Sequence, residues 1–174
     1  MVLLMSLLTS FAALAATGTV AYATGAGSLN YYYNHDGSPT WNPSQVRGAG
    51  YAYSAPAIVH SSRTDNTEMV VEGPNQTLDY YYNHDGKSGW SESAIKGAST
   101  DATPAIAYND VYGNTEIAVQ GANHTLYYYY NHDGTPGWSG GAVSGPGAYS
   151  APAIVHSDST DNTEIAAEGP TWTL

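Results

Sequence analysis

The sequence predicts an all-β protein assembled from tandem copies of one unit of about 48 residues, and three recurring landmarks carry this prediction. The block Tyr-Tyr-Tyr-Asn-His-Asp-Gly occurs at residues 31–37, 80–86 and 128–134, and a tryptophan follows each copy. A proline recurs every 48 residues, at Pro56, Pro104 and Pro152. The tripeptide Asn-Thr-Glu occurs at residues 66–68, 114–116 and 162–164. One supersecondary unit has therefore been copied in tandem.

The repeat from residue 97 to residue 145 predicts four short strands. Residues 103–108 form an apolar run that a proline opens, which is allowed where a strand starts. Residues 115–120 alternate well enough for a second strand. Residues 125–130 are dominated by tyrosine, an aromatic β-former, and an irregular fourth strand is expected around Trp138.

Segments rich in Asn, Asp and Gly separate these strands. They lie at residues 109–114, 121–124 and 131–134, and they predict tight turns. Four antiparallel strands in a period of this length are typical of a β-propeller blade. A solenoid of parallel coils would need a shorter period. The predicted fold class is therefore all-β, with about 3 to 3.5 blades.

The repeat boundaries divide the chain into blades. Residues 28–48 are expected to form a partial blade, residues 49–97 and 98–145 complete blades, and residues 146–174 a second partial blade. Three blades are too few, because propellers typically have about 4 to 8. We therefore expect either a homo-oligomer that closes the ring or a piece of a longer propeller.

Residues 1–27 differ from the repeats and are read as an apolar leader. Small residues near Ala15 and Ala23 resemble signal-peptidase sites, which favours a secreted or extracellular protein. However, no Lys or Arg precedes Arg47, so the basic start of a secretory signal is missing. A degenerate half-blade is the alternative. The stretch is too short and too rich in Ala and Thr for a membrane span.

Composition and charge exclude several functions. Formal net charge is −11, with only 4 Lys and Arg, so nucleic acid and an anionic membrane surface would be repelled. Cysteine is absent, which removes disulfides and thiol nucleophiles. One histidine per repeat leaves His35, His84 and His132 far apart around a ring, so no metal site and no cofactor are expected.

The carboxylates also argue against an enzyme. A glycosidase needs two carboxyl groups about 5 to 9.5 Å apart, and the pair is normally unique in its chain. Here the carboxylates recur once per repeat, as in a multivalent binder. Glycine-rich phosphate motifs are absent.

One repeat resembles a blade of the PLL-like (Photorhabdus-type) lectins, which are bacterial seven-bladed propellers. The motifs that carry the resemblance are residues 54–59, 66–68, 73–78 and 80–83 with Trp90, and it extends over residues 28–174. The resemblance implies calcium-independent binding of fucose and related, sometimes O-methylated, sugars. It places several shallow sites between adjacent blades. The chain departs from the family because it supplies only about half of the blades.

Two residue types in the repeats suit a sugar. A tryptophan ring can cover the apolar C–H face of a sugar, and the candidates are Trp41, Trp90 and Trp138. Each could equally be a core residue between blades. A glutamate can accept hydrogen bonds from two vicinal hydroxyls. The candidates are Glu68, Glu116 and Glu164, with the adjacent Asn66, Asn114 and Asn162. The alternative for the glutamates is a bond to backbone amides of the turn.

The sequence therefore predicts a multivalent lectin whose partners are fucosylated or methylated glycans. The alternative is a non-catalytic propeller module for protein–protein interaction, or a fragment of a larger propeller protein. Both interpretations predict repeated antiparallel sheets, and they differ only in what the sheet borders bind.

Overall fold

The computed structural model describes residues 27–34, 38–84, 87–133 and 137–170. The predicted leader lies outside the described residues except for Gly27. The described residues form strands and two short 3₁₀ turns. Within them, no helix has the length and apolar character needed to cross a membrane.

The strands form two sheets of four strands and two sheets of two. The first small sheet pairs β1 (Gly27–Tyr33) with β2 (Asn42–Ala52). The first large sheet has the order β3 (Ala57–Ser61), β4 (Asn66–Glu72), β5 (Thr77–His84) and β6 (Ser91–Ser99). The second large sheet has the order β7 (Ala105–Asn109), β8 (Asn114–Gly121), β9 (Thr125–His132) and β10 (Ser139–Pro146). The second small sheet pairs β11 (Ala153–Ser157) with β12 (Asn162–Ala166). All the pairs are antiparallel.

The turn between the first two strands of each unit needs a left-handed residue. Asp65, Gly113 and Asp161 hold this same position with φ of 54°, 69° and 53°. Glycine adopts such a φ without steric cost, and aspartate is among the few other residues that tolerate it. The sequence therefore fixes this hairpin with short polar residues or glycine in every copy.

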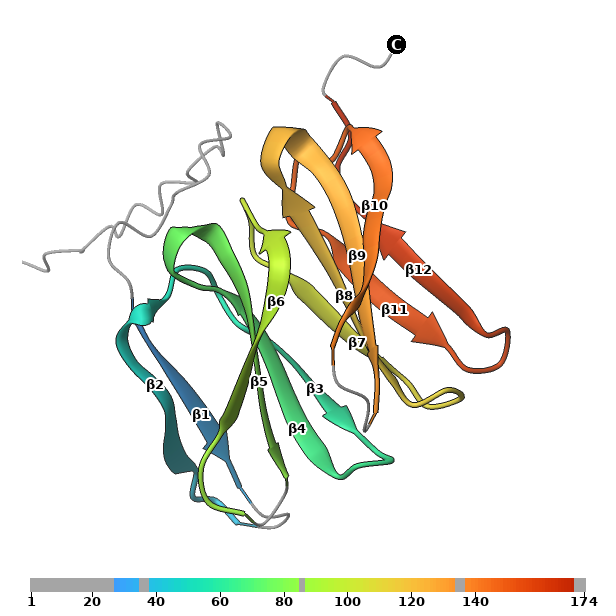
Figure 1. Cartoon of the computed structure of the whole chain (residues 1–174). Helices are drawn as coiled ribbons and strands as arrows, with labels where there is room; N and C mark the ends of the chain where they lie inside the picture. Colours follow the sequence, from blue (N-terminus) through green and yellow to red (C-terminus); the bar gives the residue numbers. More distant parts are fainter. Residues whose placement is uncertain (1–26, 35–37, 85–86, 134–136, 171–174) are drawn as a thin grey trace, which may run out of the picture.

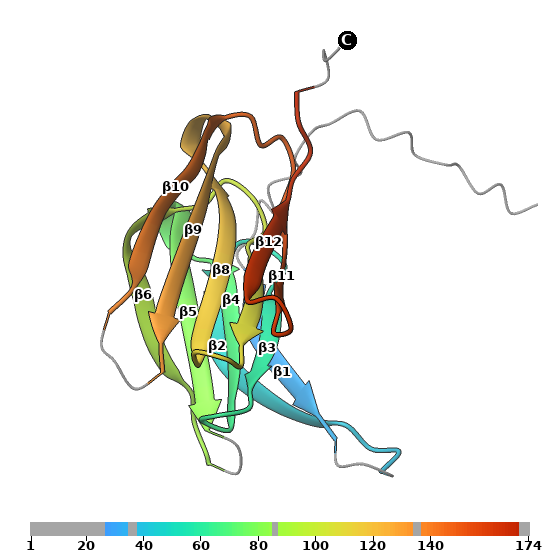
Figure 2. The ribbon, with the colours of Figure 1, turned by 90° about the vertical axis from the view of Figure 1, so that its right-hand side faces the viewer.

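The four sheets follow one another around a common centre (Figure 1). The first strands β3, β7 and β11 are neighbours in space, whereas β6 and β10 lie at the opposite edges of their sheets. Figure 2 shows β10, β9 and β8 side by side, with the pair β11 and β12 next to them. Each large sheet is one four-stranded propeller blade, so the predicted fold class is confirmed as a partial propeller.

The two small sheets are opposite halves of a blade. In the repeat, Tyr31 of β1 occupies the position of Tyr80 of β5, so β1 and β2 correspond to the last two strands of a blade. Asn162 of β12 occupies the position of Asn66 of β4, so β11 and β12 correspond to the first two. The described residues thus end at both sides in half a sheet.

The hydrophobic cores lie between neighbouring sheets. Val70 and Leu78 from one large sheet pack with Ile117 and Val119 from the next, and all four are fully buried. A smaller cluster joins β1 to the first large sheet through Leu29, Val71 and Tyr81. Burying such an aliphatic side chain stabilises the fold by about 1.5 to 3 kcal/mol, so each sheet depends on its neighbour for its stability.

Candidate functional site

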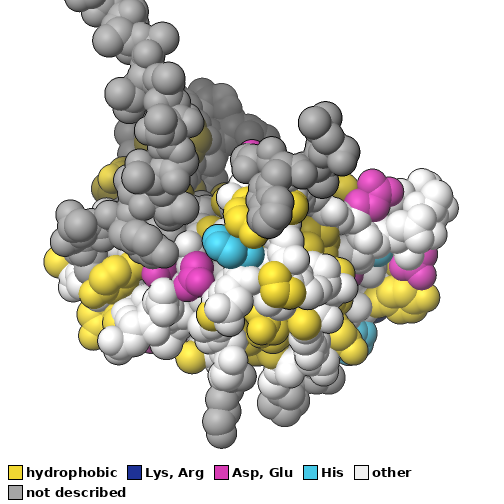
Figure 3. Space-filling view, turned by 90° about the horizontal axis from the view of Figure 1, so that it is seen from above, with side chains coloured by type: hydrophobic (Ala, Val, Ile, Leu, Met, Phe, Trp, Pro, Cys, Tyr) yellow, Lys and Arg dark blue, Asp and Glu magenta, His cyan; other side chains and the backbone are white. Residues whose placement is uncertain are grey.

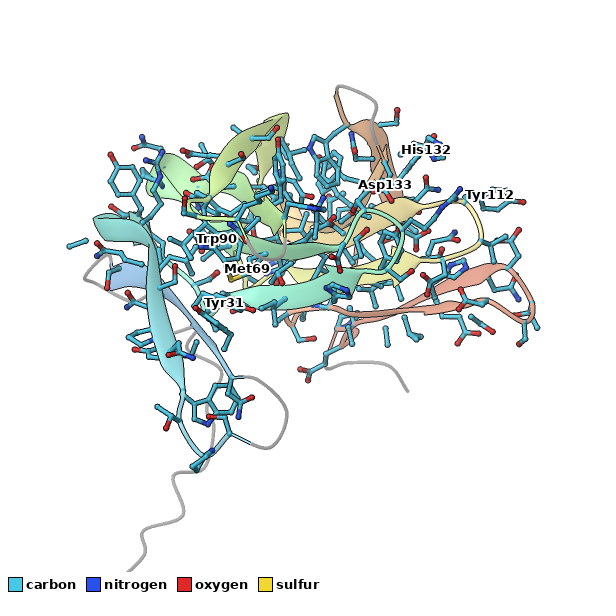
Figure 4. The ribbon with its side chains drawn as sticks, turned by 90° about the horizontal axis from the view of Figure 1, so that it is seen from below. Tyr31, Met69, Trp90, Tyr112, His132 and Asp133 are labelled. Atoms are coloured by element: carbon cyan, nitrogen blue, oxygen red, sulfur yellow. The ribbon has the colours of Figure 1, made fainter. Side chains whose placement is uncertain are left out.

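The tryptophans of the repeat lie at the borders between sheets. Trp90 packs edge-on against Tyr31 of the preceding sheet, with ring centroids 5.2 Å apart and planes at 73°. Trp138 repeats this contact on Tyr80, at 5.0 Å and 74°. Figure 4 shows Trp90 beside Tyr31. Both indoles are partly buried, whereas Trp41 is 61% exposed because the described residues supply no sheet before β1 and β2.

The asparagine of the Asn-His-Asp-Gly block holds the loop that leads to each tryptophan. The Asn34 side-chain amide donates to the Ser38 carbonyl at 3.1 Å. The Asn83 amide donates to the carbonyls of Lys87, at 3.2 Å, and Gly89. The equivalent Asn131 amide donates to the Gly137 carbonyl. This repeated hydrogen bond from the asparagine holds the loop in place, and the loop in turn positions the indole at the border of its sheet.

Two of the three predicted glutamates are buried between sheets. Glu68 and Glu116 are each 1% exposed. The Thr115 hydroxyl donates to Glu68 across the border, and the Thr163 hydroxyl donates to Glu116 at 2.7 Å across the next one. Burial raises the pKa of Glu68, and the hydrogen bond from Thr115 partly opposes that rise. Each carboxylate therefore ties one sheet to the following sheet.

The third copy of the Asn-Thr-Glu motif, on β12, has no following sheet among the described residues. Glu164, which corresponds to Glu68 and Glu116, is exposed on β12. The adjacent asparagines show the same contrast. The Asn66 and Asn114 side-chain oxygens lie 3.3 Å and 2.9 Å from the Nδ1 atoms of His84 and His132, whereas Asn162 is exposed.

A hollow lies between the first two sheets. It is a groove of about 660 Å³ whose lining includes Tyr31, Tyr33, Asn34, Asn83, Lys87 and Trp90. A shallower hollow of about 330 Å³ continues over Tyr82 and His84 and shares the loop from Lys87 to Trp90. The tyrosine rings of Tyr31 and Tyr33 stack at 5.6 Å and 14° along one wall. The groove thus joins flat aromatic surfaces to amide groups and one ammonium group.

The stacked tyrosines recur at each sheet. Tyr80 and Tyr82 stack at 5.7 Å, and Tyr128 and Tyr130 stack at 5.8 Å. The second border therefore has the same tyrosine pair, facing the loop that carries Trp138. Part of that loop, residues 134–136, lies outside the described residues.

The predicted site residues are only partly brought together. Of the nine, Trp90 lines the groove and Trp138 holds the matching place at the next border. Sequence reasoning missed four groove residues that it did not name as site candidates: Tyr33, Asn34, Asn83 and Lys87. The signal for Tyr33 was present, because alternate residues of a strand face opposite sides and Tyr33 therefore shares a face with Tyr31. Lys87 directly follows the repeated block, and its place in the wall depends on how two sheets meet.

The surface around the sheets carries acidic and apolar side chains. The face seen in Figure 3 shows Asp and Glu side chains beside hydrophobic ones, and no lysine or arginine is visible there. Among the residues that the structure describes, no group of three or more His, Asp and Glu side chains could hold a metal ion.

Comparisons with known proteins support the fold. No protein-family model matches the sequence, and no curated protein matches it significantly. The structure is similar to that of a triple arginine-to-alanine mutant of AofleA from Arthrobotrys oligospora, with a TM-score of 0.60 and 18% sequence identity. The match covers 80% of this chain and 42% of that chain, so the matched part spans less than half the length of AofleA. At this identity, the likeness shows the fold alone.

Proposed function

We propose that the chain is a multivalent, non-catalytic lectin that holds sugars in the grooves between neighbouring blades. The observation that carries the proposal is the groove where stacked Tyr31 and Tyr33 face Asn34, Asn83 and Lys87. Ligand sites in proteins commonly combine aromatic walls with a few convergent polar groups. Fucose and its O-methylated relatives are the first candidates, because the repeats resemble PLL-like blades.

The chemistry of a sugar matches this lining. The C–H face of a pyranose can lie against the Tyr33 ring, which is 39% exposed. Its hydroxyls can donate to the Asn83 side-chain oxygen, because the amide nitrogen of Asn83 already bonds its own loop. The Lys87 ammonium can donate to a sugar oxygen from the opposite wall. Trp90 supports the wall through its contact with Tyr31.

The proposed site leaves out Glu68 and Glu116. Both carboxylates are 1% exposed and already accept hydrogen bonds from the neighbouring sheet. A sugar could reach them only by separating two blades, which would expose the core between them. Their recurrence follows from the recurrence of the blade border.

The grooves act together because the border is repeated. Tyr82 and Asn131 match Tyr33 and Asn83 at the second border, so one copy offers two equivalent positions. Weak sites gain avidity when a surface displays several copies of their ligand, by about 10² to 10⁴ in favourable geometry. Shallow grooves with millimolar affinity would therefore suffice for a glycan-coated surface.

The test is a glycan array followed by calorimetric titration with free L-fucose. The wild-type chain should bind fucosylated glycans, and free fucose should compete. Tyr33→Ala should remove one sugar per chain, and Tyr33→Ala with Tyr82→Ala should remove two. Tyr112→Ala is the matched control, because Tyr112 is an exposed tyrosine that lines neither groove.

The proposal fails if no glycan binds, or if Tyr33→Ala binds as many sugars as the wild type while circular dichroism shows a folded chain. Capture of a protein that fucose does not displace, without any glycan binding, would instead favour a protein-recognition module.

A further inference from the structure

We propose that two copies of this chain close one propeller ring by pairing β12 of each copy with β1 of the other. The observation is that the two small sheets are complementary halves of a blade. β1 and β2 supply the last two strands, and β11 and β12 supply the first two. In the described residues, β1 and β12 each have a strand on one side only.

The complete blades give the register of the new pair. Val70 faces Tyr80 in the first complete blade, and Ala118 faces Tyr128 in the second. The same register places Ala166 opposite Tyr31 of the second copy. Ala167 then lies opposite Asn30, as Val71 lies opposite Asp79.

The exposed residues on these two edges match buried ones in the complete blades. Ala166 is exposed, whereas Val70 and Ala118 have no exposed surface. Tyr32 is 57% exposed, whereas the equivalent Tyr81 is 1% exposed. An unpaired edge strand with apolar side chains readily pairs with another chain. A second copy offers the same sequence pattern that already covers these positions within one chain.

The pairing also supplies the missing neighbour of Trp41. Trp90 packs on Tyr31 and Trp138 packs on Tyr80, and the next tyrosine of this series is Tyr128. In the closed ring, Trp41 of the second copy takes the corresponding place on Tyr128. The indole that is 61% exposed in one copy would then lie between two blades like the other two.

The blade count selects two copies. The described residues of each copy form two complete blades and two halves, so two copies would supply six blades. Six lies within the usual range of about 4 to 8, whereas one copy gives three and three copies give nine. The similar structure of AofleA agrees in size, because 80% of this chain matches 42% of that one.

Closure would add one groove per copy. Tyr128 and Tyr130 stack as Tyr31 and Tyr33 do, and they would face the loop that carries Trp41 of the second copy. The pairing rests on the strand edges alone, and only this gain of a groove rests on the proposed function. A single copy would bind two sugars, and each copy in the ring would bind three.

The test measures the mass of the full-length chain in the absence of sugar, by light scattering and native mass spectrometry. The wild type should be a dimer. Ala166→Asp should be a folded monomer, because the new carboxylate is exposed in one copy but would be buried on pairing. Ser159→Asp is the control with the same added charge. Ser159 lies in the exposed turn before β12, and the equivalent Arg63 stays exposed beside a complete blade.

A monomeric wild type, or a dimeric Ala166→Asp, overturns the proposal. The register has its own test, since the chain contains no cysteine. Ala167→Cys with Asn30→Cys should form disulfide-linked dimers on oxidation, and Ala167→Cys with Ser28→Cys should not, because partners two residues out of register lie about 7–8 Å apart.

Sugar titration separates this inference from the proposed function. A dimer that binds no sugar keeps the pairing and rejects the lectin. If fucose binds, Ala166→Asp should lose one sugar of three per chain. Tyr130→Ala should lose one sugar in the dimer and none in the Ala166→Asp background.

Discussion

The complete blades and the half-sheets contain the same motifs in different surroundings. Glu68 and Glu116 lie in complete blades and are 1% exposed, whereas Glu164 on the half-sheet β11–β12 is exposed. Trp90 and Trp138 are partly buried, whereas Trp41 next to the half-sheet β1–β2 is 61% exposed. The neighbouring blade, rather than the local motif, decides whether each residue is core or surface.

This difference explains why a repeated motif gives an ambiguous functional signal. A residue that recurs once per blade is equally useful for binding a ligand and for binding the next blade. In the complete blades, the glutamates make the second kind of contact, through Thr115 and Thr163. Substitutions made in pairs, one in a complete blade and one in a half-sheet, can therefore separate the two roles.

The largest effect is expected from Glu68→Ala. The substitution leaves the buried hydroxyl of Thr115 without its acceptor and opens a gap between two blades. We expect a loss of about 3 kcal/mol in the free energy of unfolding, measured with urea. Glu68→Gln should cost about 1 kcal/mol, because its amide oxygen still accepts from Thr115.

The matched variant is Glu164→Ala in the Ala166→Asp background, where a single copy is expected. It should cost less than about 0.5 kcal/mol, because Glu164 is exposed there. Equal losses at Glu68 and Glu164 in this background would show that burial by the next blade is not the cause.

A smaller loss is expected from Trp90→Ala. The indole is partly buried against Tyr31, so its removal should cost about 2 kcal/mol, less than for a fully buried tryptophan. Trp138→Ala should cost a similar amount. Trp41→Ala should have almost no effect on unfolding in the single-copy background. Differential scanning calorimetry would detect the contrast, and a large effect at Trp41 there would contradict it.

The sequence predicted the repeated strands and turns well because both follow from local chemistry. Tyrosine-rich runs formed β5 and β9, and Asn-, Asp- and Gly-rich segments formed the turns. It could not predict which motif residues become buried, because that depends on contacts between different blades. Thr115 donates a hydrogen bond to Glu68, which lies 47 residues away in the sequence, and no local sequence pattern predicts this pair.

The groove could be predicted only in part, because it too is formed by contacts between two sheets. Trp90 was named because an aromatic ring recurs next to a polar turn. The place of Lys87 is set by the angle between two sheets, and no other copy of the repeat carries a lysine there. The proposed site therefore contains a repeated part, the tyrosine wall, and a part specific to the first border.

A pH-dependent contrast is expected between the two complete blades. Glu72 at the end of β4 is 6% exposed, and burial, with a contribution from the charge of Asp101, raises its pKa to about 7. The equivalent residue in the next blade is the neutral Gln120, which donates to the Ala148 carbonyl at 2.8 Å. At this position, one blade therefore has a buried carboxyl group and the other a neutral amide.

The sign follows from linkage between protonation and folding. The pKa of Glu72 in the folded chain lies above its ordinary value of 4.5, so the folded state binds this proton more tightly than the unfolded state. The contribution of Glu72 to the stability of the fold is therefore highest below pH 4.5, where Glu72 is protonated in both states, and it falls as the pH rises through about 7. At pH 8, Glu72→Gln should therefore be more stable than the wild type, and the difference should shrink as the pH falls towards 4.5. Gln120→Glu should instead lose stability relative to the wild type as the pH rises, because it adds a buried carboxyl group. A Glu72→Gln difference that does not vary with pH would contradict this account.

The smallest effect is expected at the first border, where an ion pair joins Arg47 of β2 to Glu92 of β6. The second border lacks this pair, because Gly140 occupies the position of Glu92. Both side chains are about one-third exposed, so Glu92→Gln should cost only about 0.5 kcal/mol at low salt. The cost should vanish in 1 M NaCl, since exposed charges are screened there. A loss that persists in high salt would mean that Glu92 acts through the hydroxyl of Tyr81, which donates to it at 3.4 Å, rather than through Arg47.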